Sequence, residues 1–450
     1  MVFVAIESPQ DWAEYLINKQ NQRLPQLSLL KLYADGHPPM YTDMKTSDKF
    51  QGLMRKARRN YADTIVSQTL ARTRLLGFRT GADSDENGDR EARRIMRAND
   101  LKTGFKDLHR WVFTYAYGYS VVGKNNDKSL VTVHSPFEVI TEPDPVNPGQ
   151  SIAALRCFHD VKSEEDVAVL WLGGEYHEVH RPHNGAQGLV LTMDGWDWDE
   201  LTTLPSGTDF PPVVLYENEN GKGEFEPHLD LLDSIHHMIL QRLVIATTQA
   251  HRQRMVSGDF PSHDDKGNEI DYDGVFVFEP GTTIQLPSGA NITELGQAEL
   301  MGILAGAKAD LQDLSALTAT PLPALAPESA NQSAAGATLT DQAAVFKAED
   351  RQDRLDNSHS RTMSLAFQIE GDEKRAQLLD MEPIWAPAER FSLQEKADAA
   401  SKAKNLTWRK EMETIWQFSP QEIDQMEVDR AAEQLQAATL LSIGNGDTDA

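Results

Sequence analysis

Two histidines and a glutamate in the stretch His177-Glu178-Val179-His180 come nearest to a catalytic motif. A zinc protease motif places its two histidines four residues apart on one helix face. Here the spacing is three residues, and the stretch reads as a β-strand, so the two rings cannot share a helix face. With His183 nearby a weak metal site is conceivable, but a solvated strand end is the simpler interpretation. We predict no metal ligands and no catalytic residues here.

No other arrangement typical of catalysis is present. Acidic residues crowd a turn from Asp194 to Glu200, but they lack the ligand order of a calcium loop, and we interpret the turn as a hairpin tip. The sequence contains neither a GxxxxGK[S/T] phosphate loop nor a GxGxxG motif after a strand. Among 69 acidic residues, carboxylate pairs can be drawn by chance. We predict a protein that is not an enzyme and has no cofactor.

Two segments could instead serve binding. Arg55, Arg58 and Arg59 fall near one face of a predicted helix and are the best candidates for contacts with phosphate, although a solvated face with ion pairs is the default. A second helix carries small residues at a spacing that lets another backbone approach closely, and Lys308 and Asp310 exclude a lipid setting. We expect close packing with another helix, within or between subunits, at Gly302, Ala305, Gly306 and Ala309.

The composition describes a large acidic globular protein. The 450 residues are 40% hydrophobic and 25% charged, with a net charge of −26. No stretch reaches the ~20 apolar residues that span a bilayer, and the first residues do not resemble a signal peptide, so we expect a protein of the cytoplasm. Cys157 is the single cysteine, which excludes an internal disulfide. Such acidity is unlike a DNA-gripping domain; it favours solubility, or a surface past which DNA slides.

The pattern of residues predicts an α+β protein. Ser8 and Pro9 begin a helix that ends near Asp35. Period-two patterns from Tyr117 to about Leu215 predict a mostly antiparallel β unit. The expected helices cover about 45–76, 89–117, 227–256, 298–317 and 339–379, followed by two helices over 392–441. Residues 318–338, rich in Ala, Pro and Ser, are expected to form an exposed loop.

The order of these parts, and several short stretches, resemble the portal proteins of long-tailed (siphovirus-type) bacteriophages. The resemblance covers nearly the whole chain. Each stretch is weak alone, and their ordered co-occurrence carries the resemblance. They are LYADGHPP (32–39), RNYA (59–62) leading to LLGF (75–78), IMRANDL (95–101), YGYSVV (117–122), PVV (212–214) and EN (217–218).

The resemblance implies the subdomains of a portal subunit. These are a wing over 1–226, a first stem helix over 227–256, a clip over 257–297, a second stem helix over 298–317 and a tunnel loop over 318–338. A long wing helix and strand over 339–390 follow, and then a short helical crown with a tail over 391–450.

Similar proteins form rings, usually of twelve subunits, at one capsid vertex of the virion after assembly in the host cytoplasm. Viral DNA is packaged and ejected through the ring, without sequence preference. The clip binds the large subunit of terminase and later a head-completion adaptor, and the major capsid protein and scaffolding protein are further partners. No membrane is implied. Our candidates for the side chains facing DNA are Lys308, Asn331, Gln332 and Ser333.

Two alternatives stay open at this point. One alternative is another head or neck protein of the virion, such as an adaptor. The predicted order of a long helix (227–256), a small β-containing segment (257–297), a second helix (298–317) and a loop (318–338) argues against it. A carboxylate hydrolase would need a nucleophile, metal cluster or cofactor loop, and the sequence supplies none.

Overall fold

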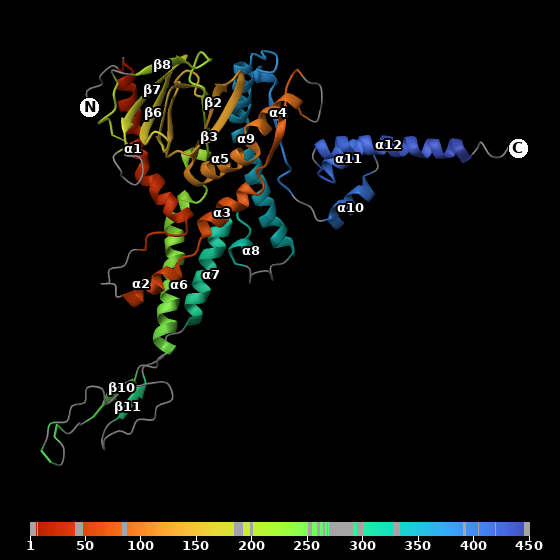
Figure 1. The fold of residues 1–450 in the computed structure, drawn as a ribbon. Helices are drawn as coiled ribbons and strands as arrows, with labels where there is room; N and C mark the ends of the chain where they lie inside the picture. The colour runs from red at the N-terminus through yellow and green to blue at the C-terminus, as the bar shows by residue number, and fades with distance from the viewer. Residues whose placement is uncertain are drawn as a thin grey trace. The chain divides into compact units, whose positions relative to one another are not determined.

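The computed structural model describes residues 6, 8–40, 48–82, 88–183, 192–198, 201–250, 254–258, 262–263, 266–267, 269, 291–294, 300–326, 334–389, 393–403, 405–418 and 420–444. They form two compact units. Unit 1 comprises Met1–Asp35, Tyr61–Pro227 and Ser315–Ala450, and unit 2 comprises Gly36–Asn60 and His228–Leu314. Both helices and sheets are present, so the predicted α+β class is confirmed (Figure 1). In the described residues, no helix combines the length and the apolar character needed to cross a membrane.

Unit 1 contains two antiparallel sheets. The five-stranded sheet has the order β4-β5-β6-β7-β8, and the three-stranded sheet has the order β3-β2-β9. This confirms the predicted antiparallel β unit. The strands are β2 (Tyr117–Asn125), β3 (Lys128–His134), β4 (Val139–Pro143), β5 (Ser151–Asp160), β6 (Glu165–Leu172), β7 (Glu175–Pro182), β8 (Thr202–Pro205) and β9 (Val213–Glu217).

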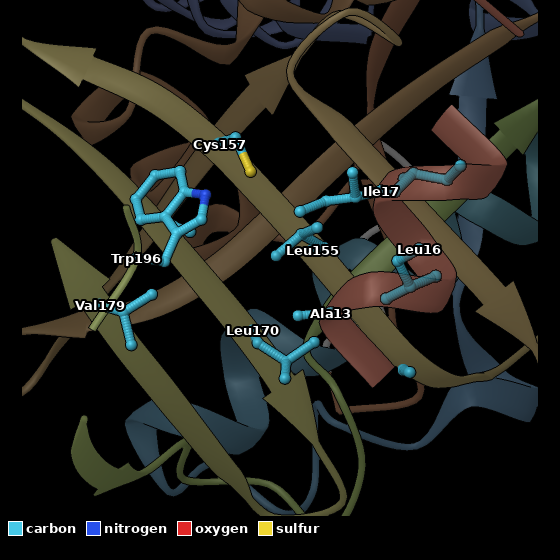
Figure 2. Close-up of a cluster of buried hydrophobic side chains, with 11 residues drawn as sticks. Ala13, Leu16, Ile17, Leu155, Cys157, Leu170, Val179 and Trp196 are labelled. Carbon is cyan, nitrogen blue, oxygen red and sulfur yellow. The ribbon is translucent and has the colours of Figure 1, made fainter. Parts of the chain in front are cut away.

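Both faces of the five-stranded sheet are buried. Helix α1 (Pro9–Ala34) covers one face, where Leu16 and Ile17 pack against Leu155, Leu170 and Trp196 (Figure 2). The three-stranded sheet covers the other face through a second cluster of buried side chains. Ser8 caps α1, as predicted: its side chain accepts a hydrogen bond from the Asp11 backbone N–H. The Asp11 carboxylate in turn accepts one from the Ser8 backbone N–H. The strands therefore hold unit 1 together by burying alternate side chains on opposite faces.

Helix α9 (Ala334–Glu370) packs on the free face of the three-stranded sheet, together with α5 (Leu101–Tyr115). Helix α3 (Tyr61–Leu70) also contacts both of these helices. The strands β1 (Leu75–Arg79) and β12 (Glu382–Trp385) form a small ladder beside α9. Two buried histidines, His109 and His359, meet between α5 and α9 with their Nε2 atoms 2.7 Å apart.

Unit 2 contains two long helices and a pair of short strands. Helix α2 (Asp48–Ala57) packs against α6 (Leu229–Ala250), and α7 (Leu300–Leu317) runs beside α6, with its last three residues in unit 1. Strands β10 (Arg254–Ser257) and β11 (Asn291–Glu294) pair antiparallel. Residues 36–60 belong to this unit, whereas the sequence assigned them to the part over 1–226.

Several predicted helix boundaries are wrong. The helix expected over 89–117 is two, α4 (Arg90–Ala98) and α5, because Asp100 adopts a φ of 50° and the Asn99 side chain bonds to the backbone of β3. The helix expected over 45–76 breaks between α2 and α3, and Gly77 lies within β1 instead of capping a helix. The helix expected over 227–256 ends at Ala250, since residues 254–257 pair with β11.

The C-terminal part also differs from its prediction. Three helices replace the expected two: α10 (Leu393–Lys402), α11 (Trp408–Thr414) and α12 (Pro420–Gly444). The long helix expected over 339–379, with an interruption at Gly371, begins at Ala334 and ends at Glu370. Gly371 has a φ of 79° and stops the helix, so the position of the interruption was predicted and the continuation to 379 was not.

The two buried histidines predict a pH-dependent stability. Burial lowers the pKa of His109 from 6.5 to about 4, and burial together with the neighbouring His109 holds the pKa of His359 well below its ordinary value. As the pH falls below 6.5, the two histidines of the unfolded chain bind protons, whereas those of the folded chain stay neutral until the pH reaches their lowered pKa. The free energy of unfolding should therefore fall as the pH decreases from 6.5. The expected loss is about 1.4 kcal/mol per pH unit for each group.

Urea unfolding between pH 7.5 and about 4.5 tests this prediction. The slope against pH should become smaller in His359→Gln, which keeps a polar atom near the Nε2 position but does not titrate. His180→Gln, at an exposed histidine, should keep the wild-type slope. An equal slope in all three proteins would contradict the assignment.

A buried ion cluster fixes α9 to the loop that follows β9. The Glu224 side chain is 2% exposed, and its carboxylate accepts from Lys347 Nζ and Arg351 Nε, each at 2.6 Å. Burial alone would raise the pKa of Glu224, but the charges of Lys347 and Arg351 outweigh it and hold the pKa below its ordinary value. The preceding residue is a glycine, Gly223, and a Cβ there would collide with the Thr114 carbonyl oxygen.

Glu224→Gln should therefore destabilise the protein by about 3 kcal/mol, because two cations stay buried without their counter-ion. Glu219→Gln is the matched control: Glu219 pairs with the same Arg351 but is 44% exposed, so its loss should cost less than about 1 kcal/mol. Urea midpoints at neutral pH measure both. Equal effects of the two substitutions would show that Glu224 does not anchor α9.

Candidate ring-packing and DNA-channel site

Helices α6 and α7 pack directly against each other inside unit 2. A Cβ on Gly306 would lie 3.0 Å from Met238 Cε, so the glycine admits this α6 side chain. The Ser234 hydroxyl donates to Asp310 at 3.4 Å. On its other side α6 packs against α2, where His236 bonds to the carbonyl oxygen of Arg59. We call the four small residues predicted to pack against another helix, Gly302, Ala305, Gly306 and Ala309, the small-residue stripe. Of these, Gly306 packs against α6 within the subunit.

The remaining small residues of α7 lie on its surface. Gly302, Ala305 and Ala309 are exposed, and a Cβ on Gly302 would meet no atom of the described residues within 4 Å. Met301 and Leu304 share this surface and are 69% and 40% exposed. A helix face that combines exposed apolar side chains with small residues is suited to close packing against another helix. The stripe thus divides into an inner residue, Gly306, and an outer set of three.

Lys308 lies on the same exposed surface of α7. It is one turn from Leu304 and Ala305, so its ammonium group and the apolar surface occupy one side of the helix. The other three predicted DNA-facing residues, Asn331, Gln332 and Ser333, lie outside the described residues. The structure therefore places Lys308 and leaves its grouping with these three as a prediction.

The loop expected over 318–338 is not an exposed loop in its first part. Thr318, Thr320 and Leu322 are buried, and a short helix, α8 (Leu322–Leu325), packs against α3. Ser315 donates to the Thr320 carbonyl oxygen at 2.7 Å, and Lys347 donates to that of Thr318 at 2.9 Å. Helix α9 then begins at Ala334. The composition suggested exposure, but tertiary contacts bury this segment.

The predicted phosphate-binding face is also revised. Helix α2 ends at Ala57, so Arg58 and Arg59 lie beyond it and do not share a helix face with Arg55. Arg59 donates to the carbonyl oxygens of Lys56 and Arg58. A basic face that the sequence analysis missed lies on α4, at positions three or four apart, and lines a shallow surface recess: Arg90, Arg93, Arg94 and Arg97. The i, i+3, i+4, i+7 spacing was the signal that could have revealed it.

The motif around His177 does not form a protease site. Both histidines lie on β7, as predicted, and their side chains point to opposite faces. His177 contacts Thr203, while His180 contacts Glu165 and Glu178. In the acidic turn Trp196 is buried against the sheet, whereas Asp194 and Asp197 are exposed; Asp199 and Glu200 lie outside the described residues, so the hairpin tip stays a prediction. His183 instead meets Asp166 from β6.

Comparison with known proteins identifies a family for this chain. The family described as "Phage portal protein, SPP1 Gp6-like" matches residues 13–439, which is nearly the whole chain. A search among curated proteins found no match. The matched range includes both units, the paired helices α6 and α7 and the whole of α9. By this match, the chain belongs to the phage portal protein family.

Proposed function

We propose that this chain forms the ring through which viral DNA is packaged and ejected at one vertex of the capsid, and that about twelve copies build the ring. The match to the portal family over residues 13–439 carries this proposal. In this assignment unit 2 provides the stem, with α6 and α7, and the clip, which includes β10 and β11. The sheets and α9 form the wing, and α10, α11 and α12 form the crown.

The partners proposed for this ring follow from the same assignment. The clip binds the large terminase subunit during packaging and a head-completion adaptor afterwards. The wing meets the major capsid protein and, during assembly in the host cytoplasm, scaffolding protein.

The charge of the chain supports a conduit that does not grip DNA. A net charge of −26 per subunit repels phosphate, which lets a duplex slide past an acidic wall. A few basic or amide side chains then provide brief contacts. Lys308 is exposed on α7, and together with Asn331, Gln332 and Ser333 it is our candidate for such contacts.

Negative-stain microscopy with native mass measurement on the full chain tests ring formation. Rings with a central channel are expected for the wild type, and Gly302→Leu should reduce their yield several-fold, because it adds bulk where only a neighbouring subunit could be met. The monomer should stay folded, since no described residue of the subunit opposes the new side chain. Ala399→Leu, at an exposed site on α10 and away from α7, is the control.

Two results would contradict this proposal. A small closed oligomer without a channel would exclude the ring. Normal ring yield in Gly302→Leu, with Ala305→Leu equally silent, would remove the outer surface of α7 from the subunit interface.

The channel residues are tested by packaging and retention of DNA. Lys308→Ala and the triple alanine substitution of Asn331, Gln332 and Ser333 should leave rings intact but lower the DNA retained per capsid several-fold, because the weak contacts that resist sliding are lost. Lys162→Ala, at an exposed turn of unit 1, should have no effect. Protected DNA length in a complementation assay gives the measurement, and normal retention in both variants would refute the assignment.

A further inference from the structure

One cluster of possible metal ligands among the described residues has no role in the proposed conduit. His159, Asp166 and His183 each offer one ligand atom, and these atoms all lie within 4.8 Å of one another. The residues are 7 and 17 positions apart along the chain, so no local sequence motif marks them. From the sequence, no metal ligands were predicted, and His183 was considered only as a neighbour of His177 and His180.

The strand register delivers these residues to one place. His159 on β5 pairs with Asp166 on β6, and Asp166 pairs with Arg181 on β7. The side chains of His159, Asp166 and Arg181 therefore lie in one row on the sheet face that α1 covers, next to Cys157. His183 follows β7 directly, where its backbone N–H bonds to the Glu164 carbonyl oxygen in the β5–β6 turn.

The two imidazoles converge on a single carboxylate oxygen. Asp166 Oδ1 lies 2.8 Å from His183 Nδ1 and 3.3 Å from His159 Nδ1. Donor atoms around a tetrahedral zinc ion, with bonds of about 2.0–2.1 Å, are about 3.3 Å apart, so the spacing is close to that of a coordination shell. His159 Nδ1 is buried and makes no hydrogen bond to any described residue. The cluster therefore holds a ligand atom that the protein itself does not satisfy.

The other oxygen of Asp166 is already fixed. Arg181 Nε donates to Oδ2 at 3.0 Å, and the same arginine lies over the Trp196 ring and donates to the Asp194 carbonyl oxygen. Such a hydrogen bond from outside the coordination shell orients a carboxylate for metal binding. Burial opposes ionisation of Asp166, but hydrogen bonds from His183 and Arg181 lower its pKa below the ordinary value, so the ligand is anionic at neutral pH.

We propose that His159, Asp166 and His183 bind a divalent transition-metal ion of the zinc class. Two imidazoles and one carboxylate suit Zn²⁺, and three protein ligands leave a fourth position for water. Both histidine side chains are partly exposed, at 32% and 22%, so the ion can reach the site. The bound ion would join the β5–β6 hairpin to the segment after β7, and it would stabilise the wing by mass action.

The test uses the full chain, stripped with a chelator and dialysed against Zn²⁺. The wild type should retain about one ion per chain, and Co²⁺ in its place should give the intense visible bands of a four-coordinate site. His159→Ala and His183→Ala should each lose this ion and the cobalt spectrum. Asp166 is left unchanged, because its substitution would also release Arg181.

His180→Ala is the matched control. This histidine lies on β7, three residues before His183 and beside β6, but it points to the opposite sheet face and is 45% exposed. It should retain the ion, which separates the proposed site from weak binding to the chain's 13 histidines. A wild type that holds no zinc, or zinc that persists in both alanine variants, overturns the proposal. Ring formation is a separate readout, so neither result bears on the portal assignment.

Discussion

A chain of buried polar side chains sets how α9 lies on the three-stranded sheet. Ser120 on β2 bonds to Thr362 on α9, Thr362 bonds to the Tyr216 hydroxyl on β9, and Tyr216 reaches His359. His359 then meets His109 on α5. Buried polar groups that lose their partners cost more than a well-satisfied network gains, so this network permits one register of α9 and disfavours others. The apolar contacts around it would tolerate small shifts of the helix, whereas these bonds do not.

Local signals account for the parts of the fold that the sequence predicted. The Ser8 cap, the alternating residues of β5 to β7 and the helical patterns of α6 and α7 each depend on residues close in sequence. The break at Asn99 depends on a bond to the β3 backbone, about thirty residues away, and no periodic pattern reports it. The burial of 318–326 depends in the same way on α3 and α9, and composition alone suggested a loop.

The candidate sites also differ in whether a local sequence pattern or a long-range contact reveals them. The stripe of small residues on α7 was visible as a helical spacing, but its division into an inner Gly306 and an outer set needed the position of Met238. The basic face of α4 was visible in the sequence and was overlooked. The grouping of His159 with Asp166 required the register of β5 and β6, which the sequence did not specify. Asn331, Gln332 and Ser333 stay predictions from the family resemblance.

The ion cluster at Glu224 has a mechanical consequence. The chain leaves unit 1 at Pro227 and re-enters it at Ser315, and α9 holds the unit 1 side of both crossings. Lys347 contacts Glu224, three residues before the first crossing, and the Thr318 carbonyl oxygen, three residues after the second. Lys347, together with Arg351 on Glu224, therefore attaches both of these connecting segments to α9. Because the two segments share one attachment on the same helix, a displacement of α9 moves the unit 1 ends of both at once.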